Sequence, residues 1–117
     1  MKIGHLELFV ANPLASLPFY RDVLGFEVVT VQAGSFVWLK LGEQELLLRP
    51  GRPFSSPPAY ADSRVGIVLY TNNLLETVET LRQRGLAITC MPNEESCYNF
   101  TDPDGNWFQL VDPTGHL

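Results

Sequence analysis

The sequence predicts an α+β fold made of two βαβββ modules in one domain, and three observations predict it. First, the same order of strand-like and helix-like segments occurs twice along the chain. Second, the residues repeat: a shift of 61 positions lays Leu8 on Leu69 and Asn12 on Asn73. Third, 117 residues make one ordinary domain and leave little chain for a second independent core.

The first module covers residues 1–50. Residues 4–10 alternate, with His5 and Glu7 on one face, which predicts a strand. A helix of about ten residues follows and ends at Gly25, a natural C-terminal cap. Because Pro18 lacks an N–H group, we expect this helix to begin near Ser16 or to be kinked there. Apolar and β-branched segments then predict three strands, at residues 26–31, 36–41 and 45–49.

Residues 51–63 are rich in proline and predict a linker. The second module covers residues 64–113, and residues 114–117 form a tail. Its helix, residues 74–84, is predicted by an N-cap at Asn73 with Glu76 as reciprocal partner. Its inward face is predicted to carry Leu74, Leu75, Val78 and Leu81. Its four strands are predicted at residues 65–71, 87–91, 98–101 and 106–111.

A helix that covers one face of each curved sheet leaves the other face concave. We therefore expect the two sheets to form an open, cup-shaped barrel in which a small molecule can bind. Uncovered sheet edges and an apolar rim also predict a homodimer.

Composition excludes several classes of protein. Hydrophobic residues make up 45% and charged residues 18%, which is globular, and no apolar run is long enough for a membrane span. The net charge of −5 disfavours binding to nucleic acid or to anionic membranes. The N-terminus carries no secretory signal, so we expect a cytoplasmic protein. Cys90 and Cys97 match no disulfide framework or zinc motif, and we expect reduced thiols.

Two segments carry a resemblance to a known family. Residues 18–26 read Pro-Phe-Tyr-Arg-Asp-Val-Leu-Gly-Phe, and residues 100–106 read Phe-Thr-Asp-Pro-Asp-Gly-Asn. With the element order and the repeat, they resemble the vicinal oxygen chelate superfamily, which includes glyoxalase I, extradiol dioxygenases and bleomycin-binding proteins. The resemblance covers nearly the whole chain. It implies the cup-shaped fold, but both segments are structural signatures and carry no chemistry.

The resemblance also implies positions for metal ligands, because the family's enzymes hold a divalent ion with three or four His, Glu or Gln side chains. The first-strand ligand matches His5 and the last-strand ligand matches Gln109. The ligand that opens the second module falls on Gly66, which has no side chain. The ligand late in the first module falls on Glu45, or on Leu46 or Leu47 by the repeat. If Glu45 is correct, His5, Glu45 and Gln109 could hold Zn, Ni, Mn or Fe, and Glu45 is also the candidate catalytic carboxylate.

Aromatic side chains in strands are candidates for ligand binding as well as for the core. The candidates are Trp38, Tyr98, Phe100 and Trp107. Arg49, at the end of an apolar strand, could hold an anionic group or be solvated. Glu7 could orient the ring of His5 or be solvated.

The missing ligand at Gly66, beside the retained aromatic residues, predicts a protein that binds an aromatic or planar small molecule with an incomplete metal site. The alternative is a metal-dependent lyase, isomerase, transferase or dioxygenase of the glyoxalase type. A second alternative is a regulatory or interaction subunit whose cavity is filled by its own side chains.

Overall fold

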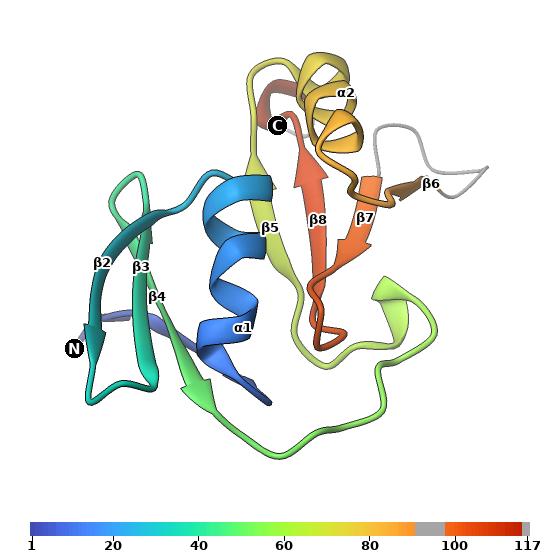
Figure 1. The fold of residues 1–117 in the computed structure, drawn as a ribbon. Helices are drawn as coiled ribbons and strands as arrows, with labels where there is room; N and C mark the ends of the chain where they lie inside the picture. The colour runs from blue at the N-terminus through green and yellow to red at the C-terminus, as the bar shows by residue number, and fades with distance from the viewer. Residues whose placement is uncertain (91–97, 116–117) are drawn as a thin grey trace. The chain divides into compact units, whose positions relative to one another are not determined.

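A computed structural model describes residues 1–90 and 98–115 of the chain. The chain divides into two compact units, unit 1 (Met1–Phe54) and unit 2 (Ser55–Leu117). The division falls inside the predicted linker of residues 51–63. Each unit contains one four-stranded sheet and has the order βαβββ, as the sequence predicted (Figure 1). The cup between the two sheets, the single domain and the homodimer remain predictions.

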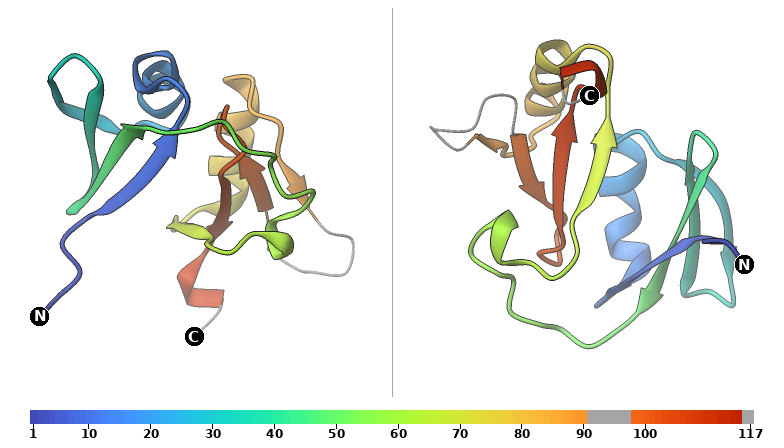
Figure 2. Two further views of the ribbon diagram at one scale, coloured as in Figure 1. Left: turned by 90° about the horizontal axis from the view of Figure 1, so that it is seen from below. Right: turned by 180° about the vertical axis from the view of Figure 1, so that it is seen from behind.

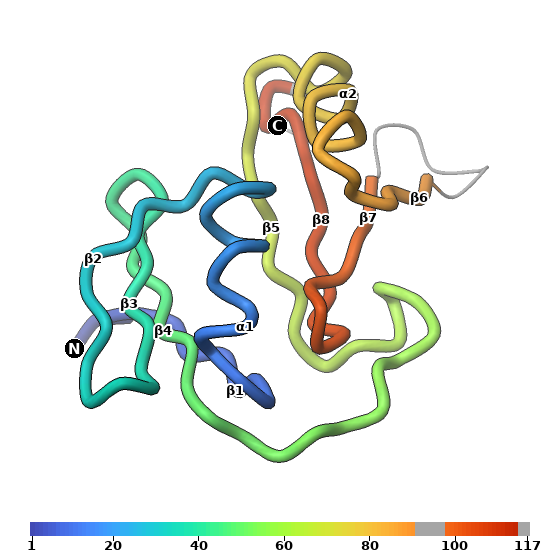
Figure 3. Tube along the Cα trace, in the orientation of Figure 1, coloured from blue at the N-terminus to red at the C-terminus, as the bar shows by residue number. Residues whose placement is uncertain are grey.

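Unit 1 is built on the sheet β1-β4-β3-β2, in which β1 (Leu6–Val10) and β4 (Gln44–Pro50) run parallel. The strands β2 (Glu27–Gln32) and β3 (Phe36–Leu41) complete it in antiparallel order. The helix α1 (Pro13–Pro18) packs against β3 and β4, and Figure 3 shows the path of the chain from β1 through α1 to β2. The core of this unit consists of Val10, Tyr20, Phe26, Val37, Leu39, Leu46, Leu47 and Leu48.

Of the two alternatives predicted for the helix of unit 1, a start near Ser16 is wrong, because the helix begins at Pro13 and changes its hydrogen bonding after Pro18. α1 (Pro13–Pro18) starts after Asn12, whose side chain accepts a hydrogen bond from the Ala15 backbone N–H. After Pro18 the chain forms a π-helical segment, Phe19–Val23. Pro18 has no N–H to donate, and after it the hydrogen bonding is i→i−5 instead of i→i−4, as in the bond from Leu24 N to Phe19 O (3.1 Å). Gly25 then ends the helix at φ +85°, as predicted.

Unit 2 is built on the sheet β5-β8-β7-β6. Its strands are β5 (Ile67–Tyr70), β6 (Thr89–Cys90), β7 (Tyr98–Thr101) and β8 (Trp107–Val111). Strands β5 and β8 are parallel, and the other two pairings are antiparallel. Short 3₁₀ turns lie at Tyr60–Asp62 and Pro113–Gly115. Figure 2 shows this sheet from two further directions.

The helix of unit 2 is α2 (Leu74–Gln83), and its predicted cap is confirmed. Asn73 Oδ1 accepts from the Glu76 backbone N–H (3.4 Å), and Asn73 Nδ2 donates to Glu76 Oε2 (2.6 Å). Val78 and Leu81 are buried as predicted, but Leu75 is 71% exposed, so its predicted inward position is wrong. Leu75 lies one residue past Leu74, about 100° around the helix, and lines an open hollow beside Tyr98 instead of the core.

The hairpin between β7 and β8 shows why the Asp-Pro-Asp-Gly-Asn segment forms a tight turn. Asp102 is 3% exposed, and its Oδ1 accepts from the backbone N–H groups of Asp104 (2.9 Å) and Asn106 (2.8 Å). Gly105 adopts φ +88°, which a side chain would disfavour. The turn fixes the register in which Thr101 pairs with Trp107, and so fixes which side chains of β7 and β8 share a face.

Candidate functional site

In unit 1 the face of the sheet opposite α1 carries a charged cluster centred on Glu7. Glu7 accepts hydrogen bonds from Arg49 Nη1 (2.9 Å, at Oε1) and from His5 Nε2 (2.8 Å, at Oε2). The Arg49 guanidinium, and secondly the His5 ring, hold the pKa of Glu7 below its usual value. Glu7 therefore contacts both residues and is more than a solvated strand residue.

Arg49 is held on several sides. Its guanidinium lies 5.4 Å from the ring centre of Phe9 and 5.5 Å from that of Phe36. The Nε atom is buried and has no hydrogen-bond partner among the described residues. Because Arg49 Nη1 donates to the Glu7 carboxylate, the positive charge of Arg49 is balanced by a negative charge within unit 1.

Trp38 lies beside His5 in the same cluster. The two rings meet edge to face with their centres 4.8 Å apart, and Trp38 Nε1 donates to Gln32 Oε1 (3.0 Å). The structure thus brings together three of the residues singled out in the sequence, His5, Trp38 and Arg49.

The metal-ligand set implied by the resemblance does not assemble within either unit alone. In unit 1 the Nε2 of His5 is bonded to Glu7, while Glu45 is exposed. Of the two implied ligand positions in unit 2, Gln109 has a side-chain oxygen and Gly66 has no side chain. Among residues 1–90 and 98–115, no three His, Cys, Asp or Glu side chains are grouped to hold a metal ion. Within the described part of each unit, the positions that the resemblance implies do not supply the three ligands that a catalytic metal needs.

Unit 2 contains a cavity of about 550 Å³ on the face of its sheet opposite α2. Tyr98 marks the α2 side, because the Arg82 guanidinium lies 5.9 Å from its ring centre. Side chains alternate along a strand, so Asn99 and Gln109, which pair with each other, face the other way. The cavity lies there, and the described residues that line it are uncharged: Pro58, Ala59, Tyr60, Ala61, Thr89, Asn99, Trp107 and Gln109.

Residues 55–63, which we call the strap, run beside the sheet in Figure 1, and residues 58–61 of the strap form one wall of this cavity. Trp107 Nε1 donates to Pro57 O (2.8 Å), and Ser56 Oγ donates to Gly105 O (3.0 Å). The ring of Tyr60 lies against Gly66, where an added β-carbon would come within 2.5 Å of Tyr60 Cζ. The position that the resemblance gives to a metal ligand is thus covered by an aromatic ring of the strap.

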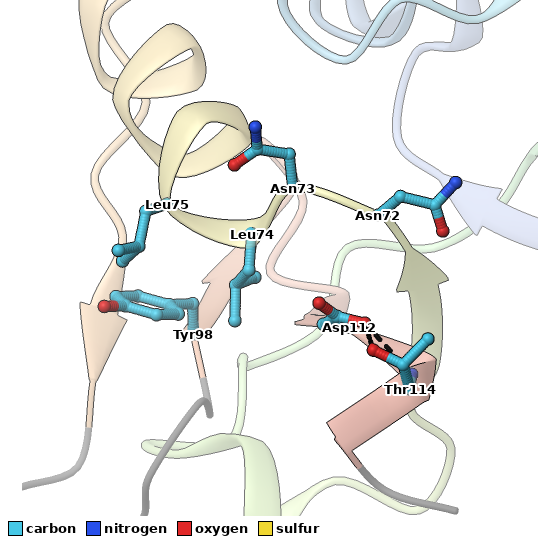
Figure 4. Close-up of a pocket in the computed structure, with 7 residues that line it drawn as sticks. All are labelled: Asn72, Asn73, Leu74, Leu75, Tyr98, Asp112 and Thr114. Carbon is cyan, nitrogen blue, oxygen red and sulfur yellow. Dashed lines mark hydrogen bonds between the residues drawn. The ribbon is translucent and has the colours of Figure 1, made fainter.

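The other two aromatic candidates lie on the opposite face. Phe100 is 1% exposed and stacks in parallel on Phe108, 5.2 Å between ring centres, so it belongs to the core. Tyr98 lines a different, more open hollow of about 440 Å³ beside the start of α2 (Figure 4). In that hollow the carboxylate of Asp112 accepts from both the N–H and the hydroxyl of Thr114.

Sequence reasoning missed Asn99, which lies between these two aromatic residues. Asn99 is 7% exposed and its Oδ1 has no hydrogen-bond partner among the described residues. A polar residue inside the apolar segment Tyr98–Thr101 was the available signal. To place Asn99 in the cavity from this signal also requires its pairing with Gln109, which the sequence alone does not give.

The fold and these sites define a protein of the βαβββ class. Residues 2–110 match the family model of the Glyoxalase/Bleomycin resistance protein/Dioxygenase superfamily, and the chain belongs to this family. Comparison with curated protein sequences gives no match. No helix of the described residues is long and apolar enough to span a membrane.

Solved structures agree with this assignment. The chain is 28% identical to a member of the superfamily from Sphaerobacter thermophilus, with TM-score 0.69 over 96% of this chain and 98% of that one. An integron cassette protein of V. cholerae is 27% identical, with TM-score 0.70 over 94% and 95%. The antibiotic-binding protein TnmS3 from a Streptomyces species is 23% identical, with TM-score 0.72 over 96% and 98%, which shows a shared fold.

Proposed function

We propose that the protein binds a small aromatic or otherwise planar organic molecule in the cavity of unit 2, and that it does so without a metal ion. The observation that carries the proposal is the cavity itself, about 550 Å³ between the strap and the sheet. Cavities of roughly 300–1,000 Å³ are typical of sites for drug-sized molecules. TnmS3, which shares the fold, is an antibiotic-binding protein, and the proposal gives this chain a function of that kind.

The chemistry of the lining supports a planar ligand. Trp107 and Tyr60 supply flat apolar surfaces, and Ala59 and Ala61 leave space beside them. The indole N–H of Trp107 is already bonded to Pro57, so its ring is held in place before a ligand arrives. Such preorganisation lowers the entropy cost of binding.

The residues at the implied metal-ligand positions support binding without a metal ion. Gly66 supplies no ligand atom, and the ring of Tyr60 lies where a side chain from this position would extend. His5 lies in the Glu7 cluster of unit 1.

Saturation-transfer NMR with a panel of planar aromatic compounds, on protein kept in EDTA, tests the proposal. We expect binding that persists in EDTA and is lost in Ala59→Phe, which fills the cavity. The same change at the exposed Ala15 of unit 1 is the matched control and should leave binding intact. If no compound binds, the alternative of an interaction subunit is favoured.

One observation supports a metal-dependent enzyme as the second candidate function. Leu6 and Leu46 pair across β1 and β4, and His5 and Glu45 immediately precede them, so continuing this register by one residue would set His5 opposite Glu45. Elemental analysis of protein re-equilibrated with Mn, Fe, Ni and Zn tests it. One bound ion per chain, lost in His5→Ala, would favour the enzyme.

A further inference from the structure

We infer that the ligand of the unit 2 cavity is a neutral molecule with an N–H or O–H donor, and that Asn99 Oδ1 accepts a hydrogen bond from it. This inference rests on the proposed function and deepens it, because it names the chemical group that the cavity recognises.

The position of Asn99 comes from the sheet register. Thr89, Asn99 and Gln109 pair in turn across β6, β7 and β8, so they form one polar row across the sheet, and all three line the cavity. Side chains paired in this way lie about 4.5–5.5 Å apart at their β-carbons. A ligand that contacts one member of the row is therefore within reach of the others.

Asn99 is the member of this row with an unmet hydrogen-bonding need. Its side chain is 7% exposed, and Oδ1 is buried with no partner among the described residues. The neighbouring hydroxyl does not supply one, because Thr89 Oγ1 donates to the backbone oxygen of Asn99 (3.3 Å). Buried polar groups in folded proteins are almost always hydrogen-bonded, so an unpaired acceptor in a residue that lines a cavity indicates a donor on the ligand, which Oδ1 meets when the Asn99 amide turns toward the cavity.

The rest of the lining sets the charge and shape of that ligand. None of the lining residues that the structure describes is charged, so an ionic group would lose its hydration without gaining an ion pair with them. Trp107 and Tyr60 favour a flat apolar body. The class of ligand is then a neutral aromatic or planar compound with a lactam, amide, phenol or heteroaromatic N–H group.

The expected discrimination is large, since a site that offers a buried hydrogen-bonding group rejects an analogue that cannot satisfy it. We expect a donor-bearing compound to bind at least about tenfold more tightly than its methylated counterpart, which corresponds to about 1.4 kcal/mol.

Two matched pairs of probes test the inference, indole with 1-methylindole and phenol with anisole, each titrated into ¹⁵N-labelled protein and followed by amide chemical shifts. The donor-bearing member of each pair should bind more tightly. In Asn99→Leu the two members should bind equally, and in Asn99→Asp, which keeps an acceptor oxygen, the preference should remain. Asn72→Leu, at an exposed asparagine, is the matched control and should keep the wild-type preference.

Folding stability gives a second readout that needs no ligand. Asn99→Leu removes an unsatisfied buried oxygen, so its unfolding midpoint should be equal to or higher than that of the wild type. A strong loss of stability would mean that Asn99 is required by the fold, and would overturn the inference.

The failure of the inference differs from the failure of the proposed function. If both members of each pair bind the cavity equally, or the methylated member binds better, the inference is overturned while the proposed function stands. If no probe shifts the resonances of the cavity residues, both are overturned.

Discussion

Tyr60 and Gly66 contact each other so closely that a β-carbon at Gly66 would lie 2.5 Å from Tyr60 Cζ and 2.8 Å from Tyr60 Cε1. Gly66 is the position at which the family resemblance implies a metal ligand, and Tyr60 belongs to the strap that forms a wall of the unit 2 cavity. The ring of Tyr60 therefore occupies the space that a side chain at position 66 would need, and the same residue lines the cavity.

This contact predicts a specific double-mutant result. Gly66→Ala should destabilise the protein by about 1 kcal/mol, at the lower end of the range for overpacking, because the ring can yield at the end of its side chain. In a Tyr60→Ala background the same change should cost nothing measurable, since the clashing atoms are gone. Urea denaturation of the four proteins measures the coupling, and an equal cost in both backgrounds would contradict the contact.

The hydrogen bond between Trp107 and the strap predicts local protection. Trp107→Phe removes the donor to Pro57 O and should cost about 1 kcal/mol. It should also speed tryptic cleavage at Arg64, next to the strap. Trp38→Phe, in unit 1, removes a comparable bond to Gln32 and serves as the control. Equal cleavage rates in the two variants would show that Trp107 does not hold the strap.

Phe100 is predicted to act through stability alone. Phe100→Ala should destabilise the protein by about 3–5 kcal/mol, because the residue is 1% exposed and stacked on Phe108. Tyr70→Ala, at a position 72% exposed, should change stability by less than about 0.5 kcal/mol. The milder Phe100→Leu should leave ligand affinity unchanged. A selective loss of affinity in Phe100→Leu would contradict its placement in the core.

The ion pair of Glu7 and Arg49 predicts a pH dependence. The pKa of Glu7 is lowered in the folded protein, chiefly by Arg49, so the pair stabilises the fold above the usual carboxyl pKa. That contribution is lost as the pH falls through the lowered value. Arg49→Gln should raise the pKa of Glu7 toward 4.5, which ¹³C NMR titration of the carboxyl measures. Arg52→Gln, at an exposed arginine outside the cluster, should leave it unchanged, and no shift in Arg49→Gln would refute the pair.

Much of the fold could be predicted from sequence because local signals and packing agree. Residues 36–41 form β3 within the predicted bounds, and the Asn73–Glu76 cap begins α2 where it was expected. The course of the first helix past Pro18 could not be predicted, since residues Phe19–Val23 adopt wider π-type hydrogen bonding that no local propensity indicates.

The candidate site was harder to predict, because it depends on which face each strand presents. The sequence indicates aromatic residues at 98, 100 and 107, but only the register shows that Trp107 faces the cavity while Phe100 faces the core. The same register brings the overlooked Asn99 beside Gln109. Strand pairing is a long-range property, so composition and alternation within one segment cannot supply it.

The measurement that tests the central claim most directly is a ¹⁵N–¹H NMR titration of the EDTA-treated protein with 2-naphthol. We expect saturable shifts centred on the amides of Thr89, Asn99 and Gln109 and on the indole N–H of Trp107, unchanged when Zn²⁺ replaces EDTA. Binding that requires the metal, or shifts centred on His5 and Glu45, would contradict it.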